Sequence, residues 1–299
     1  MRNSLVGLAF GLVFIARASG ADQLPVYDGN DHGDPPFLLE DGWKPLLNGT
    51  NLDGWTYRDP RRNGTWMATK GVAWPGTNNP KALIGRPEPG DRIVNTVKGP
   101  ASDLICNEKM SDFELYLEFM IPANSNSGVF LHGLYEMQIW DSFGIVPRLD
   151  TDRTGALYHY EGGPINGVDG GVVPLVRAER YHGQWNAFHV WFQCPRFDAT
   201  GKKIQNAKFL RVLLNGQLIH ENQERLGRTQ ASPKMPEAET NPVVMLHGDH
   251  GAVAFRNIYV RPLRPLTAMA PDLQPTGQAP SSGRGGRGGN PPAPPAKKQ

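Results

Sequence analysis

The chain has 299 residues, of which 31 are basic and 29 acidic, so its formal net charge is only +2 at pH 7. The C-terminal tail has four bases and one acid, and Arg2 and Arg17 lie near the N-terminus. These terminal residues carry more than the whole net positive charge, so the residues between them are slightly acidic. This balance argues against nucleic acid or another polyanion as a partner of the folded part. The two cysteines, Cys106 and Cys194, are too few for a disulfide framework. One bridge or two buried thiols both fit the sequence.

The N-terminal residues have the features of an export signal. Arg2 is followed by an apolar run from Leu5 to Ala16, and the small residues 18–20 precede a cleavage position before Ala21. The run is too short to span a bilayer comfortably, although an uncleaved anchor is the alternative. We therefore expect a protein that is exported to the periplasm, the cell surface or the medium.

The C-terminal residues 265–299 are rich in proline and glycine and poor in apolar side chains, so we expect this tail to be disordered. Its "RGGRGG" repeat resembles RNA-binding tails, but an exported protein meets little RNA. Electrostatic contact with an anionic envelope polymer, or a spacer role, fits the tail better. The predicted organisation is a signal peptide (1–20), an N-terminal extension (21–40), a folded domain (41–264) and the tail.

The folded part alternates between apolar and polar residues with a period of two, as β-strands do. In 113–119 the side chains of Phe113, Leu115, Leu117 and Phe119 share one face. Similar runs cover 127–133, 135–141, 185–194, 209–214, 217–221, 242–248 and 253–263. Asn215-Gly216 between two of them is typical of a two-residue hairpin turn. Many short strands with turn signals predict an antiparallel sandwich or barrel.

Two predicted strands carry aromatic, amide and acid side chains on the face opposite their apolar one. In 135–140 these residues are Glu136, Gln138 and Trp140, and in 185–194 they are His189, Trp191 and Gln193. Aromatic rings stack on the apolar faces of sugars, and amides and acids bond the hydroxyl groups. We therefore expect both strands to contribute to one concave, sugar-binding groove.

The stretch "YEMQIWD" has the spacing E-x-Q-x-x-D. Glu136 and Gln138 share a face of the strand, whereas Asp141 joins them only if a β-bulge intervenes. The spacing is similar to the E-x-D-x-x-E of laminarinase-type glycoside hydrolases, with Glu136 and Asp141 in the two outer carboxylate positions. The amide at Gln138 and the short Asp141 depart from a retaining hydrolase, whose carboxyls lie about 5 Å apart. A half-exposed strand with polar residues in solvent is the alternative.

Several blocks together resemble one family. "GWKPLLNGTNLDGW", "DFELYLEFMIPANSNSGVFLHG", "YEMQIWDS", "TGALYHY", "WNAFHV", "VLLNGQLI" and "HGDHGAVAFRNIYVRPL" occur in the order found in the 3-keto-disaccharide hydrolase domain family. The resemblance extends from Trp43 to Leu263. It implies an all-β fold, a concanavalin A-like jelly-roll β-sandwich of two antiparallel sheets with a concave ligand face. It also implies export and a carbohydrate substrate, namely a 3-keto-glycoside.

Cleavage of a 3-keto-glycoside differs from ordinary glycoside hydrolysis. The ketone at C3 acidifies the C2 hydrogen, so a base removes it and the enolate expels the C1 substituent with help from an acid. Addition of water to the resulting enone completes the cleavage. Such a site needs a base, an acid and a group that stabilises the enolate oxygen.

The matching blocks supply candidates for these roles. The catalytic candidates are Glu136 as the preferred base, His132 and His159 as acid or base, and Asp141 as an acid or orienting group. The substrate-binding candidates are Asn126, Gln138, Trp140, Tyr158, Trp191, Asp249, His250 and Arg256. Arg256 either stabilises the enolate or pairs with an acid at the edge of the core.

The sequence leaves the cofactor and two rival functions open. A divalent metal on His132, Glu136, Asp141 and His159 would stabilise an enolate, but no short ligand signature indicates one. A non-catalytic carbohydrate-binding module would keep the aromatic residues and amides and tolerate loss of Glu136. A conventional glucanase would act on unoxidised glucans. The oligomeric state is not predicted.

Overall fold

The computed structural model describes residues 36–96 and 101–265. The predicted signal peptide, most of the predicted extension and nearly all of the predicted tail lie outside these residues. Within them the secondary structure consists of strands and three short 3-10 turns: η1 (Pro36–Leu39), η2 (Pro60–Arg62) and η3 (Gly76–Asn78). None of the helical turns in the described ranges is long and apolar enough to cross a membrane.

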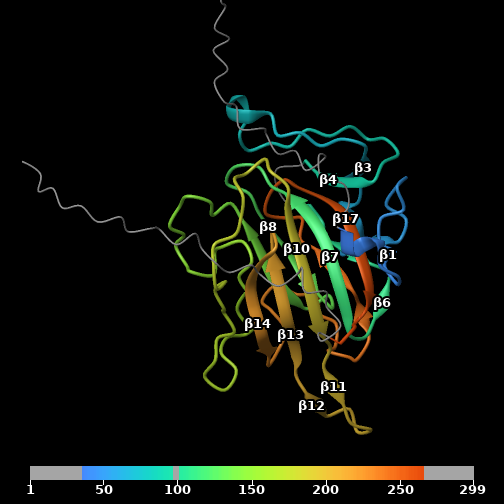
Figure 1. Cartoon of the computed structure of the whole chain (residues 1–299), viewed down its shortest axis with the longest axis vertical. Helices are drawn as coiled ribbons and strands as arrows, with labels where there is room; N and C mark the ends of the chain where they lie inside the picture. Colours follow the sequence, from blue (N-terminus) through green and yellow to red (C-terminus); the bar gives the residue numbers. More distant parts are fainter. Residues whose placement is uncertain (1–35, 97–100, 266–299) are drawn as a thin grey trace, which may run out of the picture.

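The larger sheet contains eight antiparallel strands. Their order is β14-β13-β10-β7-β17-β4-β3, and β1 pairs with β17. The strands are β1 (Lys44–Pro45), β3 (Trp66–Thr69), β4 (Arg92–Asn95), β7 (Phe113–Met120), β10 (Asn186–Gln193), β13 (Ala207–Leu214), β14 (Gln217–Arg225) and β17 (Val253–Pro262). Strands β14, β13, β10, β7 and β17 lie side by side at the front of Figure 1. The β13–β14 hairpin turns at Asn215-Gly216, both with positive φ, so the predicted turn is confirmed.

The smaller sheet contains five antiparallel strands in the order β2-β5-β16-β8-β9. They are β2 (Trp55–Tyr57), β5 (Leu104–Cys106), β16 (Val244–Leu246), β8 (Asn126–Leu131) and β9 (Tyr135–Trp140). Two small ribbons complete the strands, β11 (Arg196–Phe197) with β12 (Lys203–Gln205) and β6 (Lys109–Met110) with β15 (Asn241–Pro242). The chain therefore folds as an all-β jelly-roll sandwich, as predicted.

The hydrophobic core fills the space between the two sheets. Leu115 and Leu117 of β7 and Phe188 of β10 are fully buried in it, as are Met137 and Ile139 of β9 from the smaller sheet. These residues belong to the apolar faces that the alternation predicted. The core also contains Cys106 and Cys194, which are buried free thiols, so the second of the two sequence alternatives applies.

The prediction of one groove shared by β9 and β10 is wrong. The two strands belong to different sheets, and in each the polar set points away from the common core. Glu136 therefore lies on the outer face of the smaller sheet and Trp191 on the outer face of the larger sheet. Sequence alternation shows which residues of a strand share a face, but it does not show which sheet the strand joins.

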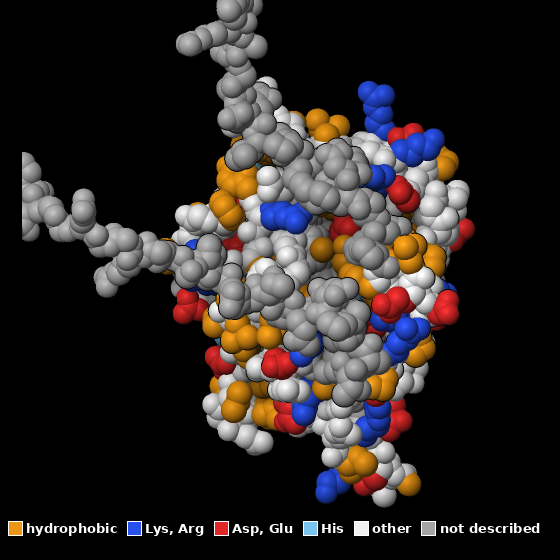
Figure 2. Space-filling model, in the orientation of Figure 1, with side chains coloured by type: hydrophobic (Ala, Val, Ile, Leu, Met, Phe, Trp, Pro, Cys, Tyr) orange, Lys and Arg blue, Asp and Glu red, His pale blue; other side chains and the backbone are white. Residues whose placement is uncertain are grey.

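Part of the outer face of the larger sheet is covered by η1. The ring of His189 stacks between Trp191 (centroids 3.9 Å apart) and Phe37 of η1 (4.4 Å). The described part of the face seen in Figure 2 carries basic and acidic side chains interspersed. Within the larger sheet, Arg211 of β13 and Glu221 of β14 form a cross-strand ion pair of 2.9 Å.

Candidate functional site

The register of the smaller sheet sets up a row of side chains across its outer face. Gly128 of β8 lies opposite Gln138 of β9. On the other side of Gly128, the backbone N–H of His247, just after β16, donates to the Gly128 carbonyl at 2.9 Å. Asp103, just before β5, accepts a hydrogen bond from the N–H of Gly248 at 2.9 Å. Residues distant in the sequence therefore meet here because the strands pair in this order.

The missing side chain at Gly128 makes room for Glu136. A Cβ atom at position 128 would lie only 2.4 Å from Oε1 of Glu136. The Glu136 side chain instead lies over β8, and its Oε1 comes within 3.7 Å of Nδ1 of His247. Glu136 is only 4% exposed. Burial disfavours its charged form and raises the pKa of Glu136 to about 7, near the value expected of a general base at neutral pH.

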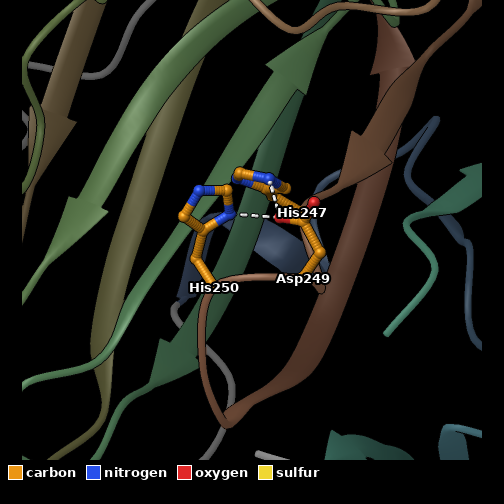
Figure 3. A group of neighbouring side chains, drawn as sticks. All are labelled: His247, Asp249 and His250. Atoms are coloured by element: carbon orange, nitrogen blue, oxygen red, sulfur yellow. Dashed lines mark hydrogen bonds and ion pairs between the residues drawn. The ribbon is translucent and has the colours of Figure 1, made fainter. Parts of the chain in front are cut away.

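In the turn that follows β16, His247 and His250 both contact the carboxylate of Asp249. Both imidazole rings turn toward Asp249, as Figure 3 shows. Nε2 of His247 lies 2.6 Å from Oδ1 of Asp249, and Nδ1 of His250 contacts the same oxygen. The nitrogen and oxygen atoms that the three residues offer all lie within 4.8 Å of one another.

Electrostatics in this turn favour charged forms despite burial. Burial alone would lower the pKa of His247, but its hydrogen bond to Asp249 and the nearby carboxylates of Glu136 and Asp103 raise it to about 8. Burial would raise the pKa of Asp249, yet its bonds to His247 and His250 hold it well below its usual range. The turn therefore carries a permanent carboxylate next to His247, whose imidazole bears positive charge readily.

A hollow of about 470 Å³ opens beside this turn. His247, Asp249 and His250 form one part of its lining, and Asp103 with Arg58 forms another. Arg58 pairs with Asp103 at 3.0 Å, which fixes that carboxylate at the rim. The volume is in the range of small-ligand pockets. Glu136 is not one of the lining residues, but its Oε1 lies 3.7 Å from Nδ1 of His247, which is.

The structure brings several predicted site residues to this face. Asp249 contacts both His247 and His250, and His247 in turn lies 3.7 Å from Glu136. Gln138 lies on the same face of β9 as Glu136, opposite Gly128 of β8. Three further candidates flank the row on the same face: half-buried Trp140 on β9, Asn126 opposite it on β8, and Tyr158. The N–H of Tyr158 donates to the Glu136 carbonyl at 3.2 Å, so the segment around it extends the sheet beyond β9.

Asp141 does not join Glu136. The β8–β9 register runs without a shift from Asn126 to Leu131, so no bulge turns Asp141 to the Glu136 face. Its carboxylate instead accepts a hydrogen bond from the N–H of Asn124 at 2.8 Å and pairs with His182 at 3.2 Å. Glu136 and Asp141 therefore do not form the carboxylate pair of a laminarinase-type strand, in keeping with the departures at Gln138 and Asp141.

His132 and His159, the two histidines predicted as acid or base, do not contact the His247–Asp249–His250 turn. His132 is fully buried beside Tyr135 and Phe192 of the core, and this burial lowers its pKa to about 4. His159 bonds to Thr151 at 2.9 Å and pairs with Asp169 at 3.4 Å. With His132 in the core and Asp141 bonded to Asn124 and His182, the metal ligand set considered from the sequence does not assemble.

Trp191 and Arg256 lie on the opposite side of the sandwich, so their predicted contact with the same substrate is wrong. Trp191 is 1% exposed beneath His189. Arg256 bonds to Glu118 at 2.6 Å, and its guanidinium lies over the ring of Trp185 at 4.2 Å. For Arg256 the structure therefore favours the alternative, pairing with an acid at the edge of the core.

Sequence reasoning missed three residues of the site: Gly128, His247 and Asp103. His247 begins the motif "HGDHG", in which only the aspartate and the second histidine were assigned. A glycine inside a strand indicates a close approach by another group, so Gly128 carried a usable signal. Asp103 carried none, because its place depends on the pairing of β5 with β16.

Fold and site together define a jelly-roll β-sandwich protein with a polar site on the outer face of its smaller sheet. The sequence profile of the 3-keto-alpha-glucoside-1,2-lyase-like domain family matches residues 42–261, so the chain belongs to this family. No curated protein matches the chain.

Solved structures resemble this chain to different degrees, and the one with a TM-score above 0.5 shares its fold. One from Parabacteroides distasonis, described as a "putative glycosyl hydrolase", is 23% identical, has a TM-score of 0.51 and covers 75% of this chain and 84% of its own. A second from the same organism, described in the same words, is 22% identical with a TM-score of 0.44 and covers 74% and 99%. A carbohydrate-binding module from Bacillus subtilis is 13% identical with a TM-score of 0.36 and covers 72% and 97%.

Proposed function

We propose that this protein is an exported carbohydrate-active enzyme that cleaves 3-keto-glycosides by elimination followed by hydration. The family match supports the substrate class, and the apolar run at residues 5–16 supports export. The observation that carries the proposal is the position of Glu136, a nearly buried carboxylate with a pKa of about 7. It lies 3.7 Å from His247, which is one of the residues that line a hollow of sugar size.

In this proposal Glu136 removes the C2 proton of the bound keto sugar. The electron pair of the C–H bond moves to the C3 oxygen and then returns to expel the C1 substituent, which leaves an enone that water attacks. His247 and His250 face the developing negative charge on the C3 oxygen, where imidazole donors stabilise it. The phenol of Tyr158, whose pKa burial raises, stays protonated and is the donor we assign to the leaving oxygen.

The flanking residues would hold the sugar. Trp140 offers a half-buried aromatic ring on the Glu136 face, and Gln138 and Asn126 offer amides. Oδ1 of Asn126 is buried without a hydrogen-bond partner among the described residues, so it is an acceptor that a sugar hydroxyl would satisfy. Remote contacts of this kind place the C2 hydrogen near the base.

Parallel incubations with a 3-keto-glucoside and with its parent glucoside test the proposal, with release of the C1 substituent as the signal. We expect turnover of the keto sugar alone. Turnover of the parent alone would indicate a conventional glucanase, and binding of sugar without turnover of either would indicate a carbohydrate-binding module. Gly71→Ala is a suitable control variant, because a Cβ atom there meets nothing within 4 Å and should not alter turnover.

A further inference from the structure

The turn after β16 has the donor composition of a transition-metal site. Two imidazole nitrogens and one carboxylate oxygen, from His247, His250 and Asp249, lie within 4.8 Å of one another. Among the described residues this is the one group of three or more histidine, cysteine, aspartate or glutamate side chains with such spacing. Imidazole and carboxylate together suit divalent first-row ions such as Zn²⁺, Co²⁺ and Mn²⁺. We propose that these three residues bind one such ion.

The backbone holds the three donors in a fixed turn. A Cβ atom at Gly248 would lie 2.7 Å from the Ser102 carbonyl oxygen, and one at Gly251 would lie 2.3 Å from Oγ of Ser125. Both glycines are thus pressed against neighbouring segments. The N–H of Gly248 is also bonded to Asp103. A turn fixed at both ends presents its side chains in one arrangement, which lowers the entropic cost of binding an ion.

The surroundings of His247 match those of a metal-ligating histidine. Its Nε2 is directed to Asp249 at 2.6 Å, and its other nitrogen, Nδ1, lies 3.7 Å from Glu136. Nδ1 is buried without a hydrogen-bond partner among the described residues. Histidine ligands commonly direct their second nitrogen to a carboxylate, which fixes the ring and strengthens the ligand. Glu136 is placed to do this for His247.

The ion would remain open to a ligand from the hollow. All three residues line the hollow, and the side chain of His250 is 52% exposed. Three protein ligands leave at least one coordination position for a substrate oxygen. This inference deepens the proposed function of the same site, because an ion bound there would stabilise the enolate oxygen of a 3-keto sugar in place of direct donation by the two imidazoles. Its test does not depend on turnover.

Metal binding to the full chain is measured after removal of bound metal with a chelator. Titration with Zn²⁺ is followed by calorimetry, and titration with Co²⁺ by its visible absorption bands. We expect one ion per chain. His250→Ala removes a half-exposed ligand without disturbing the core, so it should weaken affinity at least 10-fold, and Asp249→Asn should do the same. The matched control His159→Ala should bind like the wild type.

The absence of saturable binding, or unchanged affinity in both His250→Ala and Asp249→Asn, would overturn the inference. Glu136→Gln gives a separate readout, since loss of a carboxylate behind a ligating histidine weakens metal binding by about 10- to 100-fold. Intact, cluster-dependent binding in a protein that does not turn over 3-keto-glycosides would contradict the proposed function alone.

Discussion

Substitution of Gly128 by alanine tests whether the placement of Glu136 matters for catalysis. The added Cβ would lie 2.4 Å from Oε1 and 3.1 Å from Cδ of Glu136, whereas ordinary contacts begin at 3.4 Å. The carboxylate must therefore move by about 1 Å, and a misplacement of this size in an active site costs about 100-fold in rate. We expect kcat/KM for a 3-keto-glucoside to fall by about that factor. The free energy of unfolding should change by no more than about 1 kcal/mol, because alanine is intrinsically favoured over glycine inside a strand.

Gly71→Ala is the matched control, because a Cβ atom there meets nothing within 4 Å. Both variants are assayed for release of the C1 substituent and for stability in urea. The control should resemble the wild type in both measurements. A Gly128→Ala enzyme with wild-type kcat/KM would refute the reasoning that Glu136 must lie where the structure places it.

Three further predictions concern residues away from the base. Arg256→Ala leaves the buried carboxylate of Glu118 with hydrogen bonds from Tyr116 and Asn257 but without the Arg256 guanidinium, so we expect a loss of about 3 kcal/mol in urea unfolding with kcat of the folded enzyme unchanged. A lower kcat at normal stability would indicate instead that Arg256 acts in the active site. Trp140→Ala should raise KM about 10-fold because the sugar loses a stacking partner. Trp191→Ala should instead lower the free energy of unfolding by about 3–5 kcal/mol and leave KM unchanged. The reverse pattern would place the sugar on the outer face of the larger sheet. Burial lowers the pKa of His220 from 6.5 to about 4, so its contribution to stability is present above pH 6.5 and is lost as pH falls toward 4. His220→Asn should reduce the pH dependence of the unfolding free energy over this range by about 3 kcal/mol, and an unchanged slope would contradict that assignment.

The strands could be predicted because their determinants are local. Alternation in 113–119 and 135–140 reports which side chains face the core, and Leu117 and Met137 are buried there. The hairpin at Asn215-Gly216 depends only on two residues that tolerate positive φ. The shortest strands, such as β1 and β6 with two residues each, are too short to carry a period and were not predicted.

The pairing of strands was not predictable from local patterns, and the site depends on it. β9 and β10 show the same kind of polar face, yet they lie in different sheets, so Trp191 and Glu136 face opposite sides. His247 reaches Glu136 only because β16 pairs with β8 and Gly128 leaves a gap between them. The sequence thus identified Glu136, Asp249 and His250 as candidates but could not show that His247 joins them.

Proton abstraction by Glu136 is the step on which the account depends, and hydrogen exchange measures it directly. A 3-keto sugar with no leaving group at C1 cannot eliminate, so its C2 hydrogen should exchange with deuterium from D₂O in the presence of the wild-type protein, as seen by proton NMR. We expect Glu136→Gln to slow this exchange at least 100-fold, in line with typical general-base contributions. Equal exchange rates in the wild-type protein and in Glu136→Gln would contradict the assignment of Glu136 as the base.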